Sequence, residues 1–249
     1  MAQALTIEGL STVLVTGLLP PLLWLWFWLK EETHKEPKGA VMKSFVLGMA
    51  SVPFVLLLEY AWCSFSLKYG FVQSCDSSTA TGFASLWLLI PWAFIEEVSK
   101  FTVAWWADLR RSIYEAPIDA VIYLITVALG FAAMENILFL LKTHTGGGGL
   151  LTIVATADLR FIGATILHTV ASGIVGVSIA FTFFHPEIHA RNIWGGLILA
   201  TVLHTAFNKF IIGGVSSSSV FQTFLIIWTL ALILIFFFEK VKRIKPQKI

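Results

Sequence analysis

Residues 117–141 have the sequence PIDAVIYLITVALGFAAMENILFLL, and this stretch decides the fold class. It exceeds the roughly 20 residues that an α-helix needs to cross the hydrocarbon core of a bilayer. The whole chain of 249 residues is 57% hydrophobic and 13% charged, whereas a soluble domain carries roughly 25% charged residues. A soluble core of this size has no room for so much apolar surface. The sequence therefore indicates a protein that is embedded in lipid.

Six further apolar stretches predict an all-α, polytopic membrane protein with about seven transmembrane helices. The predicted spans are 9–29, 41–63, 84–106, 117–141, 159–184, 194–212 and 220–238. No internal repeat and no separate soluble domain is visible in the sequence. Residues 1–249 are therefore expected to form a single transmembrane domain, with the catalytic core within 84–212.

The lysines and arginines set the expected orientation, because cytoplasmic loops of membrane proteins are enriched in them. Two of them, Lys68 and Lys142, fall in one set of loops. The opposite loops and the tail hold twelve: Lys30, Lys35, Lys38, Lys43, Arg110, Arg111, Arg191, Lys240, Lys242, Arg243, Lys245 and Lys248. This bias predicts that the N-terminus lies outside and the C-terminus in the cytoplasm. The net charge of +2 is too small to suggest a nucleic-acid partner.

The third predicted span contains three charged residues, Glu96, Glu97 and Lys100. A charged side chain at the bilayer centre costs roughly 2.5–3.5 kcal/mol on insertion scales. Glu96 and Lys100 are four residues apart, so they share a helix face and are expected to pair. Glu97 points about 100° away from Glu96 and lacks that partner. Either carboxylate suits a general base that activates water.

Three other spans carry polar residues at comparable depths: Glu135 and Asn136, Arg160 and His168, and His204 and Asn208. At 1.5 Å per residue, Glu96 lies about 18 Å from the outer end of its span, the two histidines about 12–14 Å and Glu135 about 9 Å. Each residue alone has a structural explanation, such as an ion pair or a hydrogen bond between helices. Their similar depth on four helices favours one shared site instead.

Several other polar residues are interpreted as structural. Glu59, near the outer end of the second span, is expected to reach the membrane interface. Asp119, near the inner end of the fourth span, is expected to face an arginine of the preceding loop. Ser172 and Gly176 form a small-xxx-small pair that is typical of close helix packing.

Four motifs follow one another over residues 90–212: Glu96-Glu97-x-x-Lys100, Phe131-x-x-x-Glu135-Asn136, Arg160 with His168, and His204-x-x-x-Asn208. Their order and spacing resemble the PrsW-type intramembrane proteases, which belong to the wider superfamily of type II CAAX prenyl endopeptidases. The segment from Ala116 to Ala120 also resembles that family's sequence. The CAAX relatives have a histidine at the position of Glu135, so the resemblance is to the PrsW type and a prenylated substrate is not expected.

The resemblance implies an all-helical fold, a catalytic centre inside the membrane and a location in the plasma membrane of a prokaryote. The PrsW type cleaves single-span anti-sigma factors on the extracytoplasmic side. The expected partners are therefore a membrane-anchored protein substrate and the lipid bilayer.

Two mechanisms remain open from the sequence. Without a metal, Glu96 or Glu97 takes the proton of a water that Glu135 and His168 orient, while His204 and Asn208 donate to the oxyanion, as the superfamily resemblance suggests. Lys100, Asn136 and Arg160 would support the site. With a metal, most plausibly zinc, the ligands would be Glu135, His168 and His204, and Glu96 or Glu97 would be the fourth ligand or the base.

Two other functions compete with proteolysis. An ion- or proton-coupled carrier also places glutamate and histidine inside the membrane, but it often shows inverted repeats and interrupted helices, neither of which is clear here. A non-catalytic membrane scaffold would not need all four motifs. The two cysteines, Cys63 and Cys75, fall near one outer loop, where a disulfide and two free thiols are equally compatible with the sequence.

Overall fold

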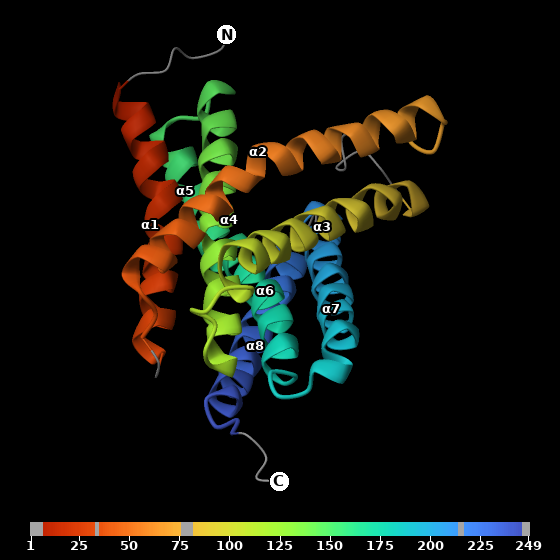
Figure 1. Cartoon of the computed structure of the whole chain (residues 1–249). Coiled ribbons are helices and arrows are strands. Elements are labelled where there is room, and N and C mark those ends of the chain that lie inside the picture. The colour runs from red at the N-terminus through yellow and green to blue at the C-terminus, as the bar shows by residue number, and fades with distance from the viewer. Residues whose placement is uncertain (1–6, 33–34, 76–81, 214–216, 246–249) are drawn as a thin grey trace.

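The computed structural model describes residues 7–32, 35–75, 82–213 and 217–245, which form helices and no strand. Eight α-helices and one π-helical turn follow one another in these ranges (Figure 1). They are α1 (Ile7–Glu31), α2 (Lys38–Lys68), α3 (Gly82–Ala104), the turn η1 (Trp105–Leu109), α4 (Pro117–Thr145), α5 (Leu150–Ile162), α6 (Ala164–Ala180), α7 (Pro186–Gly213) and α8 (Ser217–Val241). The all-α class predicted from the sequence is confirmed.

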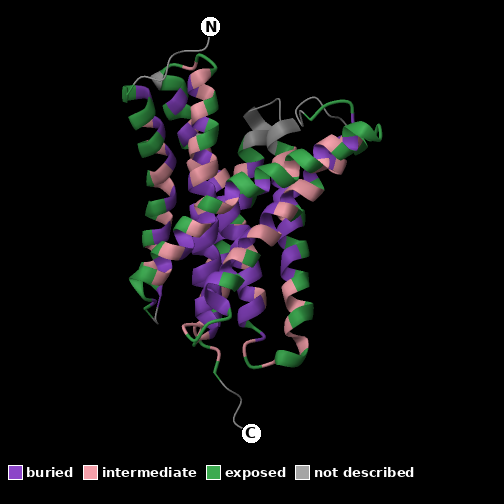
Figure 2. Cartoon of the chain, turned by 45° about the horizontal axis from the view of Figure 1, so that its top comes forward, coloured by how far each residue is buried: buried purple, intermediate pink, exposed green. Residues whose placement is uncertain are grey.

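Helix α4, which contains the stretch quoted first, is the centre of the bundle. Every residue from Pro117 to Ala133 is buried, and α1, α2 and α6 pack around it (Figure 2). A β-carbon added to Gly130 would collide with the backbone oxygen of Phe45 on α2. One added to Gly176 of α6 would lie 2.7 Å from the α-carbon of Val121. Glycine thus lets three helix backbones approach closely, and the predicted packing role of Gly176 is confirmed.

The predicted span 159–184 is wrong in its boundaries, because the chain breaks at Gly163 into α5 and α6. Gly163 has φ −118° and ψ −81°, which is not helical, and glycine tolerates such a backbone without a clash from a side chain. Within the described residues, five helical stretches are long and apolar enough to cross a membrane: Ile7–Glu31, Lys38–Lys68, Pro117–Thr145, Leu151–Ala180 and Phe221–Val241. Helices α3 and α7 are not among them. The count of seven spans and the orientation therefore stay predictions.

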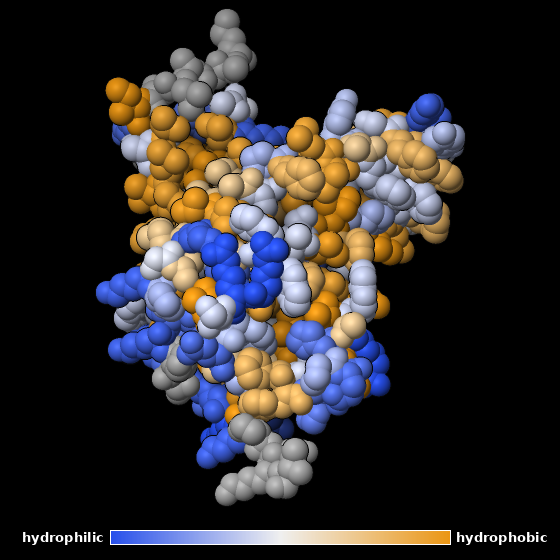
Figure 3. All heavy atoms as spheres, viewed as in Figure 1, coloured by the Kyte–Doolittle hydropathy of each residue, from blue (hydrophilic) through white to orange (hydrophobic). Residues whose placement is uncertain are grey.

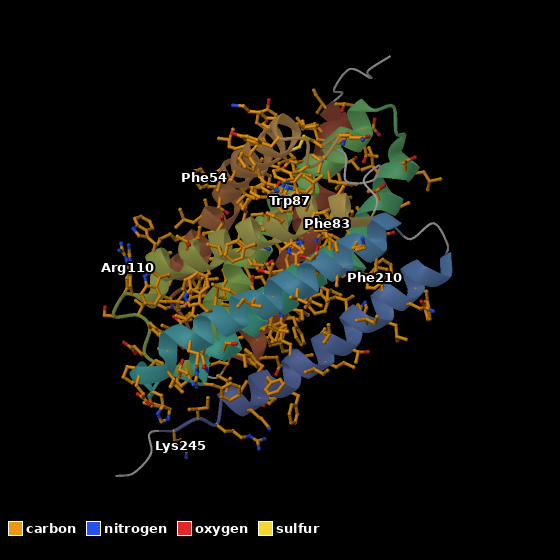
Figure 4. All side chains as sticks on the ribbon, turned by 90° about the vertical axis from the view of Figure 1, so that its right-hand side faces the viewer. Phe54, Phe83, Trp87, Arg110, Phe210 and Lys245 are labelled. Carbon is orange, nitrogen blue, oxygen red and sulfur yellow. A yellow bond between two sulfur atoms is a disulfide. The ribbon has the colours of Figure 1, made fainter. Side chains whose placement is uncertain are left out.

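Helices α2 and α3 lie side by side and extend away from the rest of the bundle (Figure 1). A disulfide between Cys63 and Cys75 closes their far end, which we call the disulfide end, and this decides between the two alternatives for the cysteines. The indole Nε1 of Trp62 donates a hydrogen bond of 3.0 Å to the backbone oxygen of Trp87. Trp87 also packs on Phe83, at 5.9 Å between ring centroids (Figure 4).

At the opposite end of the bundle, the segment between α1 and α2 is tied to α4. Glu36 is buried and accepts a hydrogen bond from the hydroxyl of Tyr123. Burial, reinforced by the negative charge of Asp119, raises the pKa of Glu36 to about 8. Asp119 itself accepts hydrogen bonds from the backbone N–H groups of Glu115 (2.9 Å) and Ala116 (2.7 Å) at the start of α4. Its structural role therefore includes capping this helix.

Candidate active site

Glu96, Glu97 and Lys100 lie on α3 where this helix faces α6 and α7. All three are buried, and Lys100 is completely inaccessible. Its ammonium Nζ lies 2.7 Å from Glu97 Oε1 and 3.5 Å from Glu96 Oε2. The expected pairing of Glu96 with Lys100 is present, but the expectation that Glu97 lacks this partner is wrong. Residues three apart also share a helix face, and here the three-residue pair is the closer one.

Glu97 is held by residues from three helices. Besides the bond from Lys100, its Oε1 atom lies 2.8 Å from His204 Nδ1 on α7, and its Oε2 atom accepts a bond of 3.4 Å from the Ser172 hydroxyl on α6. Ser172 therefore contributes a site contact as well as a small side chain for packing. A carboxylate with so many partners is suited to orienting His204.

His168, on α6, is fixed at both ring nitrogens. Its Nε2 atom lies 2.7 Å from Glu135 Oε2 on α4, and its Nδ1 atom lies 2.8 Å from Lys100 Nζ. Because the lysine ammonium can only donate, Nδ1 accepts this bond, and Nε2 carries the ring proton and donates a hydrogen bond to Glu135. The ring also packs against Phe131, at 5.5 Å between ring centroids.

Glu135 is supported by Arg160 of α5, and through it by Asn136, the next residue of α4, and Thr165 of α6. The guanidinium Nη2 of Arg160 lies 3.0 Å from Glu135 Oε2, and its Nε donates a bond of 2.6 Å to Asn136 Oδ1. Asn136 Nδ2 in turn donates to the Thr165 hydroxyl at 3.2 Å. The side chain of Glu135 is 36% exposed, so this part of the site opens to the surroundings.

Glu96, His168 and His204 form a three-residue group suited to a metal ion. One potential ligand atom from each lies within 4.8 Å of the others. Glu96 Oε1 is 3.8 Å from His204 Nε2, and Glu96 Oε2 is 4.0 Å from His168 Nδ1. The Oε2 atom of Glu96 is buried and has no hydrogen-bond partner among the described residues. Two imidazoles and one carboxylate are the ligand set of several catalytic zinc sites.

This group differs from the three ligands expected from the sequence, Glu135, His168 and His204, to which Glu96 or Glu97 was added only as a fourth ligand or the base. In the structure Glu135 contacts the nitrogen of His168 that points away from Glu96. Helix spacing identifies the residues on one face, but it does not say which of two ring nitrogens a carboxylate reaches. Lys100 occupies the space next to His168 Nδ1, so a cation bound there would replace that hydrogen bond.

Two further residues complete the description of the site. Asn208 lies one turn along α7 from His204, is half-buried and makes no side-chain hydrogen bond to the described residues. Glu59, which the sequence suggested to be structural, lies within electrostatic reach of Glu96, Glu135 and Lys100. The helix that carries Glu59 was predicted from the sequence, but the crossing of α2 with α4 and the packing of α2 along α3 were not.

The known proteins that are similar to this chain point to one family. Residues 36–238 match the model of a family described as PrsW family intramembrane metalloprotease. A Protease PrsW of Geobacillus kaustophilus is 25% identical over 198 residues, which are 79% of this chain and 78% of that protein. A Protease PrsW of Oceanobacillus iheyensis is also 25% identical, over 89% of this chain and 93% of its own length.

The Protease PrsW of Bacillus subtilis is 24% identical over 79% of this chain and 81% of its own length. No solved structure matches the chain. These bacterial relatives and the apolar helices support an integral protein of the prokaryotic plasma membrane and a protease. The match covers most of the chain and all four sequence motifs, and the chain therefore belongs to the PrsW family of intramembrane metalloproteases.

Proposed function

We propose that this chain hydrolyses a peptide bond of a membrane-anchored protein, of the anti-sigma-factor kind, near the outer face of the bilayer. The family membership supports proteolysis. The placement near the outer face follows from the depths of the polar residues in their spans, counted from the outer ends, and from the orientation that the charge bias predicts. A second feature supports the orientation of α2 and α3. These helices end in a disulfide, and disulfides form in oxidising compartments such as the bacterial periplasm or cell surface.

One observation carries the chemical proposal: each histidine of the site has one nitrogen bound by its own carboxylate. Glu97 holds His204 at Nδ1, and Glu135 holds His168 at Nε2. In the neutral rings the remaining nitrogens, which face Glu96, then carry the lone pairs. The lone pair of His168 Nδ1 accepts the hydrogen bond from Lys100, which a bound cation would replace. Metal-binding histidines almost always donate their other N–H to a carboxylate, a carbonyl oxygen or water in this way.

The residues that would hold a divalent cation are Glu96, His168 and His204, and zinc suits them best. Bound there, the cation would supply Lewis-acid polarisation of the scissile carbonyl and acidify an attacking water. Glu97 and Glu135 keep the two imidazoles in the correct tautomer and orientation. Glu96 Oε2, the buried oxygen without a hydrogen-bond partner, takes the proton of the water and returns it to the leaving amine. The amide of Asn208 donates to the developing oxyanion.

The test is cleavage of a single-span peptide by purified protein in lipid nanodiscs. We expect Glu96→Gln to lower kcat by at least about 100-fold, because it removes the proton acceptor and one of the residues that would hold the cation. A chelator is expected to abolish cleavage and added zinc to restore it. The matched control is Glu8→Gln, which changes the same charge on an exposed position of α1.

Two results would contradict parts of this proposal separately. Full activity of Glu96→Gln would remove the proposed proton acceptor. Activity that a chelator leaves unchanged would favour the metal-free mechanism, in which the same carboxylate activates water alone.

A further inference from the structure

The C-terminal end of α8 carries basic residues on two different sides, and one side faces the bundle. Phe238 is buried there and packs against Trp28 of α1, at 5.1 Å between ring centroids. The ammonium Nζ of Lys242 lies over the Phe238 ring, 4.9 Å from its centre. It also lies 4.0 Å from Glu31 Oε2 at the end of α1 and pairs with Glu239. The charge of Lys242 is therefore compensated within the protein.

Lys240 and Arg243, which we call the α8 basic patch, are exposed instead. Lys240 Nζ lies 4.7 Å from the ring centre of Phe236, which is also exposed. The backbone N–H of Arg243 donates a hydrogen bond of 3.0 Å to the backbone oxygen of Lys240, so the two cationic residues lie one turn apart. Among the described residues neither forms an ion pair, because the carboxylates at this end are bound to Lys242.

An exposed apolar stripe runs along α8 to this patch. Leu225, Leu232 and Phe236 are exposed, and their spacing of seven and four residues places them on one helix face with Lys240. In a bilayer this face contacts acyl chains. The long apolar stems of lysine and arginine lie along such a surface while the charged ends reach the headgroups. One lipid molecule can therefore contact the stripe with its chains and the patch with its phosphate.

We propose that the α8 basic patch binds the headgroup of an anionic phospholipid. Two cations without a carboxylate partner are complementary to a headgroup with a net negative charge, whereas a zwitterionic headgroup carries its own ammonium beside the phosphate. A lysine or arginine close to an anionic membrane surface contributes about a fivefold preference for it. Lys245, which is also exposed, adds a further positive charge at the same end of the chain (Figure 4). The inference does not depend on the proteolytic function.

The experiment measures lipid binding to the full chain in detergent micelles by native mass spectrometry. Phosphatidylglycerol and phosphatidylcholine with the same acyl chains are titrated separately. Wild type is expected to bind phosphatidylglycerol roughly tenfold more tightly than phosphatidylcholine. In Lys240→Gln/Arg243→Gln the two affinities should agree within about twofold, because both charges of the patch are removed. The exchange variant Lys240→Arg/Arg243→Lys keeps both charges and should keep the wild-type preference.

The matched control is Lys68→Gln/Lys142→Gln, which removes the same charge from exposed positions on α2 and α4. Lys68 also lies over an aromatic ring, that of Tyr69, at 5.8 Å. This control should keep the wild-type preference, and its loss there would show that net charge, not the patch, selects the lipid. Equal affinities in wild type, or a preference that survives Lys240→Gln/Arg243→Gln, would overturn the inference.

A last arm tests whether the ligand is a lipid or a soluble phosphate compound. Glycerophosphoglycerol, which is the phosphatidylglycerol headgroup without acyl chains, should not displace the bound lipid, because it cannot contact the apolar stripe. Displacement by this compound at a similar concentration would contradict the assignment to a lipid.

Discussion

Glu96 and Glu97 are adjacent in the sequence, yet their surroundings assign them different tasks. Glu97 accepts hydrogen bonds from Lys100 and Ser172 and contacts His204 Nδ1. Glu96 retains a buried oxygen without a hydrogen bond and faces the other nitrogen of His204. In the mechanism that we propose, the residue that orients and the residue that reacts therefore lie side by side on one helix, because consecutive side chains point about 100° apart.

The orienting carboxylates are expected to control metal affinity without binding the metal. Glu97→Gln and Glu135→Gln keep the side-chain volume but remove the charge that holds each imidazole. We predict that each weakens zinc binding by about 10- to 100-fold, measured by competition with a fluorescent chelator. Wild-type affinity in both variants would show that these contacts do not support a metal site.

Glu36 gives the fold a pH dependence of its own. Its pKa is raised from 4.5 to about 8 in the folded protein, so the folded state binds the proton more tightly than the unfolded state. The stability that this proton contributes is fully present below about pH 4.5 and is lost as the pH rises through about 8. As the pH is raised from about 4.5 to about 8, we expect the Tm in detergent to decrease, and to decrease less in Glu36→Gln than in wild type. The control is Glu31→Gln, at an exposed position shortly before Glu36. Its Tm should change with pH as the Tm of wild type does.

At the scale of the helices, the site depends on how closely α2, α4 and α6 cross. Gly48 and Gly130 lie at the crossing of α2 and α4, where an added β-carbon would collide with the backbone oxygens of Val127 and Phe45. The same crossing sets the position of Glu59 relative to Glu135. Small residues at such contacts are what allow helices to associate inside a membrane.

Gly130→Ala is expected to force α2 and α4 apart. Because the added methyl meets backbone rather than a flexible side chain, we predict a loss of about 1–3 kcal/mol in stability and a loss of peptide cleavage. Gly39→Ala is the matched control on α2, since nothing lies within 4 Å of its added β-carbon. Equal Tm values for the two variants would contradict this close packing.

Much of the helical architecture could be predicted from the sequence, because lipid imposes a length and a composition on each span. The polar residues that the structure brings together could be identified as well, since charges are costly inside a membrane. The break at Gly163 could not, because the residues on both sides of it are apolar and helix-forming. The placement of Glu96, rather than Glu135, between the two histidines depends on helix crossings and ring orientations, which the sequence does not encode locally.

For the molecule as a whole, two independent features agree on the orientation that we predict. Hydrophobic residues dominate the upper part of the face in Figure 3, and hydrophilic residues gather below them, toward the C-terminus. Lys245 lies at that lower end (Figure 4), in the tail that the charge bias assigns to the cytoplasm. The disulfide, at the far end of α2 and α3, suits the opposite, oxidising side.

The central claim is that residues from α3, α6 and α7 share one cation. The most direct test is the zinc content of the purified chain in nanodiscs after equilibration with zinc and removal of the unbound ion. We predict about one zinc ion per chain in wild type and Glu8→Gln, and a large loss in Glu96→Gln, His168→Ala and His204→Ala. Zinc that is absent from wild type, or retained by all three of these variants, would contradict the account.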